Sequence, residues 1–161
     1  MKWIVNVIRA GVCLLALAAC ESKKATAPAV DPAAAVSHRQ TLMKQNAVHW
    51  KAIKDFLEEG KGPAADVRTH AEAIQASARR IPGLFPLGTS AIDLPGRTAA
   101  RPEIWSDWTG FQQAAAELEV HAAKLAMLTE GGDAAAMNAQ FAAVARQGCG
   151  ACHNQFRLKT Q

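Results

Sequence analysis

The chain contains no tyrosine, only 6% of its residues are aromatic, and runs of β-branched residues are few. Sheets are built largely from β-branched and aromatic residues, so this composition argues against a sheet protein. Alanine is abundant instead, and it has the highest intrinsic helix propensity of any residue. The composition therefore predicts an all-α fold.

Cysteine is also scarce, with four in 161 residues, and two of these, Cys13 and Cys20, precede the folded domain. The remaining pair, Cys149 and Cys152, cannot form a structural zinc site alone, because such a site needs further Cys or paired His at ligand spacing. A redox-active dithiol is typical of a βαβ context, whereas this pair follows an Ala-rich helical stretch at the C-terminus. Both of these interpretations are therefore disfavoured.

The sequence Cys149-Gly150-Ala151-Cys152-His153 is the main chemical feature of the chain. The pattern C-x-x-C-H is the attachment signature of a c-type haem. Two thiols add across the vinyl groups of the porphyrin, and the imidazole next in sequence reaches the iron. On a helix the three side chains stand at i, i+3 and i+4 and share one face. The motif predicts one haem c, attached through Cys149 and Cys152, with His153 as an iron ligand.

The N-terminus predicts export. Residues 1–19 combine Lys2 and Arg9 with a short apolar run, as in a secretory signal peptide. Residues 17–20, Leu-Ala-Ala-Cys, resemble a bacterial lipoprotein processing site, so we predict that Cys20 is lipidated. The alternative is ordinary cleavage after a small residue. We expect a periplasmic protein that the lipid tethers to the membrane, or a soluble periplasmic protein if the lipid is absent.

Two further segments follow the predicted signal peptide. Residues 20–35 are rich in Ala and Pro and lack an apolar period, which predicts a flexible tether. Residues 36–161 have the length of one domain. Without residues 1–19 the chain carries 16 basic and 14 acidic groups, a net charge of +2. So small a charge gives no indication of a nucleic-acid partner.

Apolar residues recur at steps of three and four in four segments, as expected for helices that each bury one face. Pro102 and Glu103 favour a helix start before the third segment, and Asp133 is expected to cap the fourth. A long connection at 82–100 separates the second segment from the third. We predict an antiparallel, up-down-up-down four-helix bundle. The four apolar seams are Val36–Leu57, Val67–Ile81, Ile104–Leu125 and Met137–Phe156.

Over about residues 37–159 the chain resembles the class II c-type cytochromes, the cytochrome c′ group. One feature of this resemblance is the C-terminal C-x-x-C-H followed four residues later by Arg157. A second is the segment 101–107, Arg-Pro-Glu-Ile-Trp-Ser-Asp, which is similar to the start of the family's third helix. The third is Arg39 with Met43 four residues on. The resemblance implies a four-helix bundle that holds one haem c.

The resemblance also implies which side chains surround the haem. Arg39 would lie near a propionate with Gln40 beside it. We predict that Arg101 and Arg157 also bind the cofactor. Arg157 has two open interpretations: it either tunes the proximal imidazole or covers the exposed haem edge as a solvated side chain.

The residue at position 43, a Met, bears on which of two functions the protein has. The resemblance places it on the side of the iron opposite His153. Many family members carry Leu or Phe there, which leaves five-coordinate iron open to small gases. Met is typical of the cytochrome c-556 branch, in which the thioether is the sixth ligand and the haem is low-spin. A Met on an apolar stripe also commonly serves packing alone.

These features predict a monohaem electron carrier with His/Met-ligated, low-spin haem that docks with redox partner proteins. The alternative is a five-coordinate cytochrome c′ that binds nitric oxide or carbon monoxide. We predict that the protein is not an enzyme, because no His or Arg is convincingly placed as a distal acid–base residue. Relatives covered by the resemblance include dimers that pair through the first two helices, so a homodimer stays open.

Overall fold

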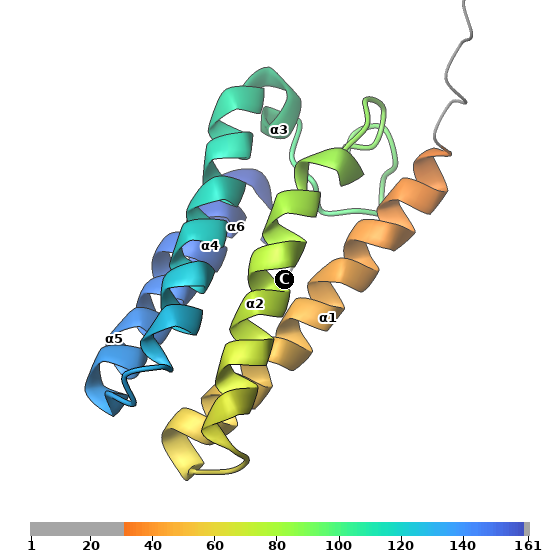
Figure 1. The fold of residues 1–161 in the computed structure, drawn as a ribbon. Helices are drawn as coiled ribbons and strands as arrows, with labels where there is room; N and C mark the ends of the chain where they lie inside the picture. The colour runs from red at the N-terminus through yellow and green to blue at the C-terminus, as the bar shows by residue number, and fades with distance from the viewer. Residues whose placement is uncertain (1–30, 160–161) are drawn as a thin grey trace, which may run out of the picture.

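The computed structural model describes residues 31–159. The predicted signal peptide, Cys20 and most of the predicted tether lie outside the described residues. The described chain folds into four antiparallel helical rods, as predicted, and contains no β-strand (Figure 1). In chain order the rods are α1 (Pro32–Glu59); α2 (Ala64–Arg80); α3 (Glu103–Ser106) with α4 (Trp108–Leu128); and α5 (Ala134–Ala143) with η2 (Val144–Gly150) and α6 (Ala151–Phe156).

The first rod begins earlier than the sequence suggested. Residues 32–35, assigned above to the tether, form the first turn of α1. The Asp31 side chain accepts a hydrogen bond from the Ala33 backbone N–H at 3.0 Å, and Pro32 occupies the first helical position, where its missing N–H costs nothing. At the other end Gly60 adopts a left-handed conformation with φ of 65°, which ends the helix.

The third rod is interrupted at Asp107, whereas the sequence predicted one continuous helix. Asp107 has non-helical backbone angles, and its side chain accepts a hydrogen bond from the Gly110 N–H at 3.0 Å, so it caps α4. A Cβ atom on Gly110 would collide with the Asp107 carboxylate in its capping position, so the glycine leaves room for the cap. The predicted cap at Asp133 is present, with its side chain accepting from the Ala136 N–H at 3.0 Å.

The fourth rod contains a π-helical segment, η2, between α5 and α6. Its i→i+5 hydrogen bonding is uncommon and is found frequently at functional sites. Gly148 in this segment lies against α4, since a Cβ atom there would be 2.8 Å from the Leu118 Cδ1 atom and 3.2 Å from its Cα. The glycine therefore lets the two rods approach closely just before the C-x-x-C-H motif.

The core is continuous where α2 meets α4. The predicted seam of α2 is buried along its whole length, and the α4 seam is buried from Phe111 to Leu125. Alanine is frequent at these contacts and allows the two helices to pack closely. The α2 seam residues, none more than 3% exposed, are Val67, Ala71, Ile74, Ala78 and Ile81.

The connection at 82–100 leads from the end of α2 to α3 at one end of the bundle, where Figure 1 shows its loops beside the upper part of α1. It begins with the short helix η1 (Pro82–Leu84). Near its end, Ala100 pairs with Arg157 in an isolated antiparallel bridge, and the Leu158 N–H donates to the Ala99 carbonyl at 2.9 Å. These contacts fix the connection beside the C-terminal segment, and hydrogen bonds from Arg39 and Gln40 fix it beside the N-terminal half of α1.

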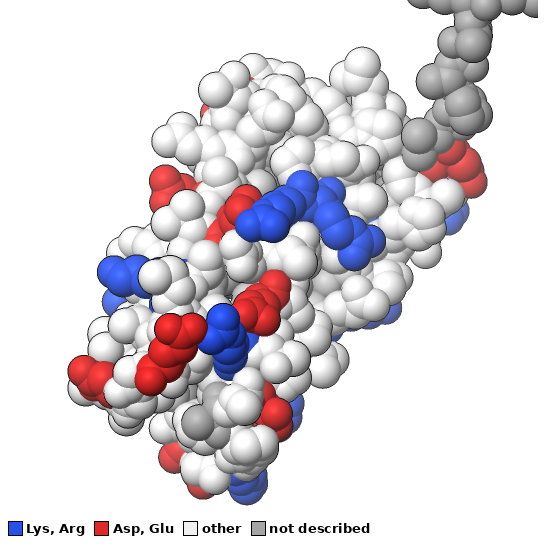
Figure 2. Space-filling view, viewed as in Figure 1, with Lys and Arg blue, Asp and Glu red and all other residues white. Residues whose placement is uncertain are grey.

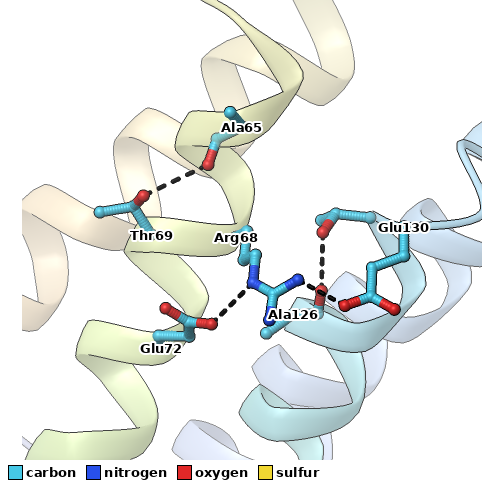
Figure 3. Close-up of polar contacts among 7 residues, drawn as sticks. Ala65, Arg68, Thr69, Glu72, Ala126 and Glu130 are labelled. Carbon is cyan, nitrogen blue, oxygen red and sulfur yellow. Dashed lines mark hydrogen bonds and ion pairs between the residues drawn. The ribbon is translucent and has the colours of Figure 1, made fainter.

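The visible surface over α2 and α4 carries charges of both signs close together (Figure 2). Figure 3 shows Arg68 of α2 between Glu72 on the same helix and Glu130 in the turn after α4. Arg79 of α2 pairs with Glu119 of α4 in the same manner. Such interleaved charges are typical of a solvated face. Within residues 31–159 no helix combines the length and the hydropathy needed to cross a bilayer.

Candidate haem site

The two motif cysteines and the motif histidine face one space in the structure. Cys149 lies near the end of η2, while Cys152 and His153 lie in the first turn of α6. All three line the same cavity, as expected for positions i, i+3 and i+4 of a helical turn.

Both thiols are half-buried, and burial raises the pKa of each of them, that of Cys152 to about 11. They therefore stay protonated at neutral pH. Buried thiols beside an apolar space suit side chains that become neutral thioethers. Among residues 31–159 no group of three or more His, Cys, Asp or Glu is arranged to hold a metal ion by itself.

The cavity lies between α1 and the C-terminal rod. It has a volume of about 390 Å³ and adjoins a second cavity of about 390 Å³, within the size range of cofactor sites. Most of the lining side chains are apolar or small, and none is acidic. The residues that line both cavities are Met43, Ala47, Ile81, Cys152 and His153.

Met43 and His153 reach this space from different rods. Met43 is half-buried on α1, one turn after Arg39, and His153 is on α6. His153 is an exposed residue, yet nearby protein atoms partly desolvate its ring and lower its pKa, and the charge of Arg157 lowers the pKa further. A neutral imidazole keeps the lone pair that an iron ligand needs.

Arg39 is buried in the wall of the second cavity, only 4% exposed. Its guanidinium donates to the Thr89 hydroxyl at 2.9 Å, to the Thr89 carbonyl at 2.6 Å and to the Thr98 hydroxyl at 2.6 Å. It also lies 4.6 Å from the centroid of the Phe85 ring. Burial lowers the pKa of Arg39 to about 10, so the side chain is still charged at neutral pH.

No carboxylate among residues 31–159 forms a salt bridge with Arg39. A buried cation is stable only when it is paired or fully hydrogen-bonded, and three of its five donor positions are used. The cavity therefore offers an apolar interior with a positive charge in its wall. This combination fits a haem, whose ring is apolar and whose propionates are anionic.

The other predicted cofactor-binding residues are placed differently from one another. Gln40 and Arg157 line the second cavity, and the Gln40 amide donates to the Arg97 carbonyl at 2.9 Å. Arg101 lines neither cavity, and its side chain forms an ion pair with Glu103. The structure thus brings Gln40 and Arg157 together at the cavity and leaves Arg101 apart from it.

Several lining residues were not assigned to the site from the sequence, and two of them lie on α1. Asn46 lines the first cavity, and its side-chain oxygen accepts a hydrogen bond of 2.7 Å from the buried Ser77 hydroxyl on α2. Trp50 also lines this cavity and stacks on Phe141, with ring centroids 3.7 Å apart. Their positions on α1, one and two turns after Met43, are the only signal of their location that the sequence contains.

The geometry can be compared with known proteins. A family model described as Cytochrome C' matches residues 34–157. A cytochrome c′ of Rhodospirillum rubrum is 33% identical over 144 residues, which cover 89% of this chain and 95% of the relative. A cytochrome c-556 of Agrobacterium fabrum is 34% identical over 138 residues, which cover 83% of this chain and 87% of the relative.

The similarity extends to solved structures. A cytochrome c′ described as having an unusual ligand-controlled dimer dissociation matches with a TM-score of 0.71 at 28% identity. The match covers 81% of this chain and 98% of the solved one. The solved structure therefore shares the helical architecture of this chain, and the names of the relatives divide between c′ and c-556.

Proposed function

Because the chain belongs to the cytochrome c′ family and carries one haem c attached through Cys149 and Cys152, we propose that it is an exported electron carrier whose iron is ligated by His153 and Met43. The bound haem supplies an iron that takes up and releases one electron. The remaining task of the protein is to hold that iron in one geometry in both oxidation states.

The observation that supports this proposal is the placement of Met43 and His153. They belong to different rods, α1 and α6, and both line the two adjoining cavities. A thioether on one side and an imidazole on the other would complete six-coordination. Met/His ligation raises the reduction potential of a haem, and the apolar lining excludes water from the site.

The second candidate is a five-coordinate cytochrome c′ that binds a small gas. Relatives named cytochrome c′ favour it, among them the solved protein whose dimer dissociation is described as ligand-controlled. In that case Met43 would only pack against the cofactor, and a gas would occupy the position beside it. The two candidate functions differ in whether the Met43 side chain binds the iron.

The optical spectrum of the reduced holoprotein, with and without carbon monoxide, tests the proposal. We expect a sharp low-spin α-band that carbon monoxide does not change. The variant Met43→Leu should become high-spin and bind carbon monoxide. Met127→Leu is the matched control, because Met127 is 70% exposed on α4 and should leave the spectrum unaltered. A broad, gas-sensitive spectrum in the unaltered protein would make gas binding the function.

The proposal includes a periplasmic location, a lipid tether and redox partner proteins. Mass spectrometry of the native protein tests the tether, which predicts a diacylated or triacylated Cys20. A mature form that begins after Cys20 would rule the tether out. A homodimer stays a proposal by analogy with the dimeric relative, and sedimentation of the holoprotein measures it.

A further inference from the structure

Two histidines meet between α1 and α2, away from the haem site. His49 of α1 and His70 of α2 are both half-buried, and neither lines the haem cavities. Their Nδ1 atoms lie 3.0 Å apart, with ring centroids 5.2 Å apart and ring planes tilted by 43°. The two residues are 21 positions apart in the sequence, so this contact is made by the packing of two antiparallel helices.

The contact needs at least one of the two rings to be neutral. At 3.0 Å one Nδ1 atom donates a proton and the other accepts it, which two protonated imidazoles cannot do. Burial, together with repulsion from a charge on His70, lowers the pKa of His49. The pair therefore presents two ring nitrogens, 3.0 Å apart, that share one proton.

We propose that His49 and His70 form a two-imidazole site for a divalent transition-metal ion, Cu²⁺ above all. The ion takes the place of the shared proton. That proton moves from Nδ1 to Nε2 of the same ring, so both rings bind as neutral imidazoles. The bound ion then joins α1 directly to α2.

The nitrogen separation matches this chemistry. With metal–nitrogen bonds of about 2.0–2.1 Å, two adjacent ligands of a square-planar ion lie about 2.9 Å apart, and two ligands of a tetrahedral ion about 3.4 Å apart. The observed 3.0 Å is nearer the square-planar value, which Cu²⁺ adopts with nitrogen and oxygen ligands. Imidazole also binds Cu²⁺ more tightly than the other divalent first-row ions.

The rest of the coordination sphere is open. Among the residues described here, no third His, Cys, Asp or Glu joins the pair as a ligand. Water would therefore complete the sphere, and the half-buried rings leave a path from solvent. These features describe an exchangeable ion rather than a permanently held structural one.

Calorimetric titration of the holoprotein with Cu²⁺ tests the site. We expect one binding event, weakened about tenfold or more in each of His49→Gln and His70→Gln, because each variant removes one of two imidazole ligands. Glutamine retains a polar side chain at the contact, and the haem spectrum and circular dichroism report whether each variant is folded. The matched control is His38→Gln, which removes an exposed histidine from the same helix and should not change the affinity.

Electron paramagnetic resonance of copper bound to the unaltered protein provides a test that needs no variant. Hyperfine coupling to two imidazole nitrogens is expected, and coupling to one in either His→Gln variant. Copper that couples to a single nitrogen in the unaltered protein, or an affinity unchanged in both variants, would overturn the proposal. The contact would then be an imidazole–imidazole hydrogen bond only. The outcome is independent of whether Met43 ligates the iron.

Discussion

The half of the bundle between α2 and α4 differs from the half between α1 and the C-terminal rod, although both are rich in alanine. In the first half the protein fills its own interior, and Ala71 is fully buried. In the second half the alanines line cavities. Ala47, for example, is exposed because it faces this open space and not a neighbouring side chain. A row of alanines in the sequence is therefore compatible with two structures: two helices packed closely together, or a cavity that a cofactor can fill. Which of the two structures forms depends on how closely the neighbouring helix approaches.

This difference explains why the haem would matter for stability as well as for electron transfer. A cavity leaves the side chains that line it without van der Waals partners. The α1 side of the site lacks those partners until the haem occupies it. The α2–α4 contact borders the cavities at residues such as Ile81 and Leu118, but others, such as Ala71, are already fully packed. We expect the holoprotein to be substantially more stable than the apoprotein, with most of the gain on the α1 side.

The largest expected effect comes from leaving the open half without its cofactor. The double variant Cys149→Ser and Cys152→Ser removes both attachment points, so exported holoprotein should fall to background. Haem staining of denaturing gels measures this directly. Cys13→Ser is the matched control, because Cys13 lies in the predicted signal peptide and should be absent from the mature protein. Normal amounts of covalently bound haem in the double variant would contradict attachment at this motif.

One substitution in each half tests whether the two halves respond differently to a larger side chain. Ala71→Leu overfills the packed half and should lower the unfolding free energy of the holoprotein by about 1–3 kcal/mol, with haem content unchanged. Ala47→Leu occupies cavity space and should lower the haem content per chain instead. Denaturant unfolding and the pyridine haemochrome assay measure the two quantities. If both variants lost stability and haem equally, the two halves would not be distinct.

Much of the packed half could be predicted from the sequence, because its signals are local and periodic. The seam from Val67 to Ile81 repeats at steps of three and four, and all five of its residues are buried as expected. The C-x-x-C-H spacing is likewise a local signal, because it places the two cysteines and the histidine on the same face of a helical turn. The sequence analysis did not predict the break at Asp107, although its signal is local: aspartate is a favoured N-cap residue, and its side chain accepts a hydrogen bond from the Gly110 N–H.

The surroundings of the haem site could not be predicted in the same way. Arg39 bonds to Thr89 and Thr98, which are 50 and 59 positions away, and no periodicity connects residues across a connection of that length. The same holds for Asn46 and Ser77, which belong to different helices. The resemblance supplied Arg39 and Met43 as site residues, but only the fold shows which side chains hold Arg39 in place.

A smaller effect is expected where the C-terminal rod meets the packed half. Gly148→Ala would bring a Cβ atom to 2.8 Å from Leu118 Cδ1, so one of the rods must shift. We expect a loss of about 1–3 kcal/mol in unfolding free energy, together with a small shift of the haem spectrum, because Cys149 follows directly. The control Gly131→Ala meets nothing closer than 3.9 Å and should change stability by less than about 0.5 kcal/mol. Equal losses in the two variants would show that close packing at Gly148 is not the cause.

The smallest effect is expected on the outer face of the packed half, where Arg68 pairs with Glu72 and Glu130 (Figure 3). Pairs between exposed side chains gain little, since water screens the charges and ordering long side chains costs entropy. Arg68→Gln should leave the thermal midpoint of the holoprotein unchanged within error, at low and at high salt. A clear, salt-sensitive drop would mean that these charges link α2 to the turn after α4. The stability of the packed half would then depend on its charged surface as well as on its apolar core.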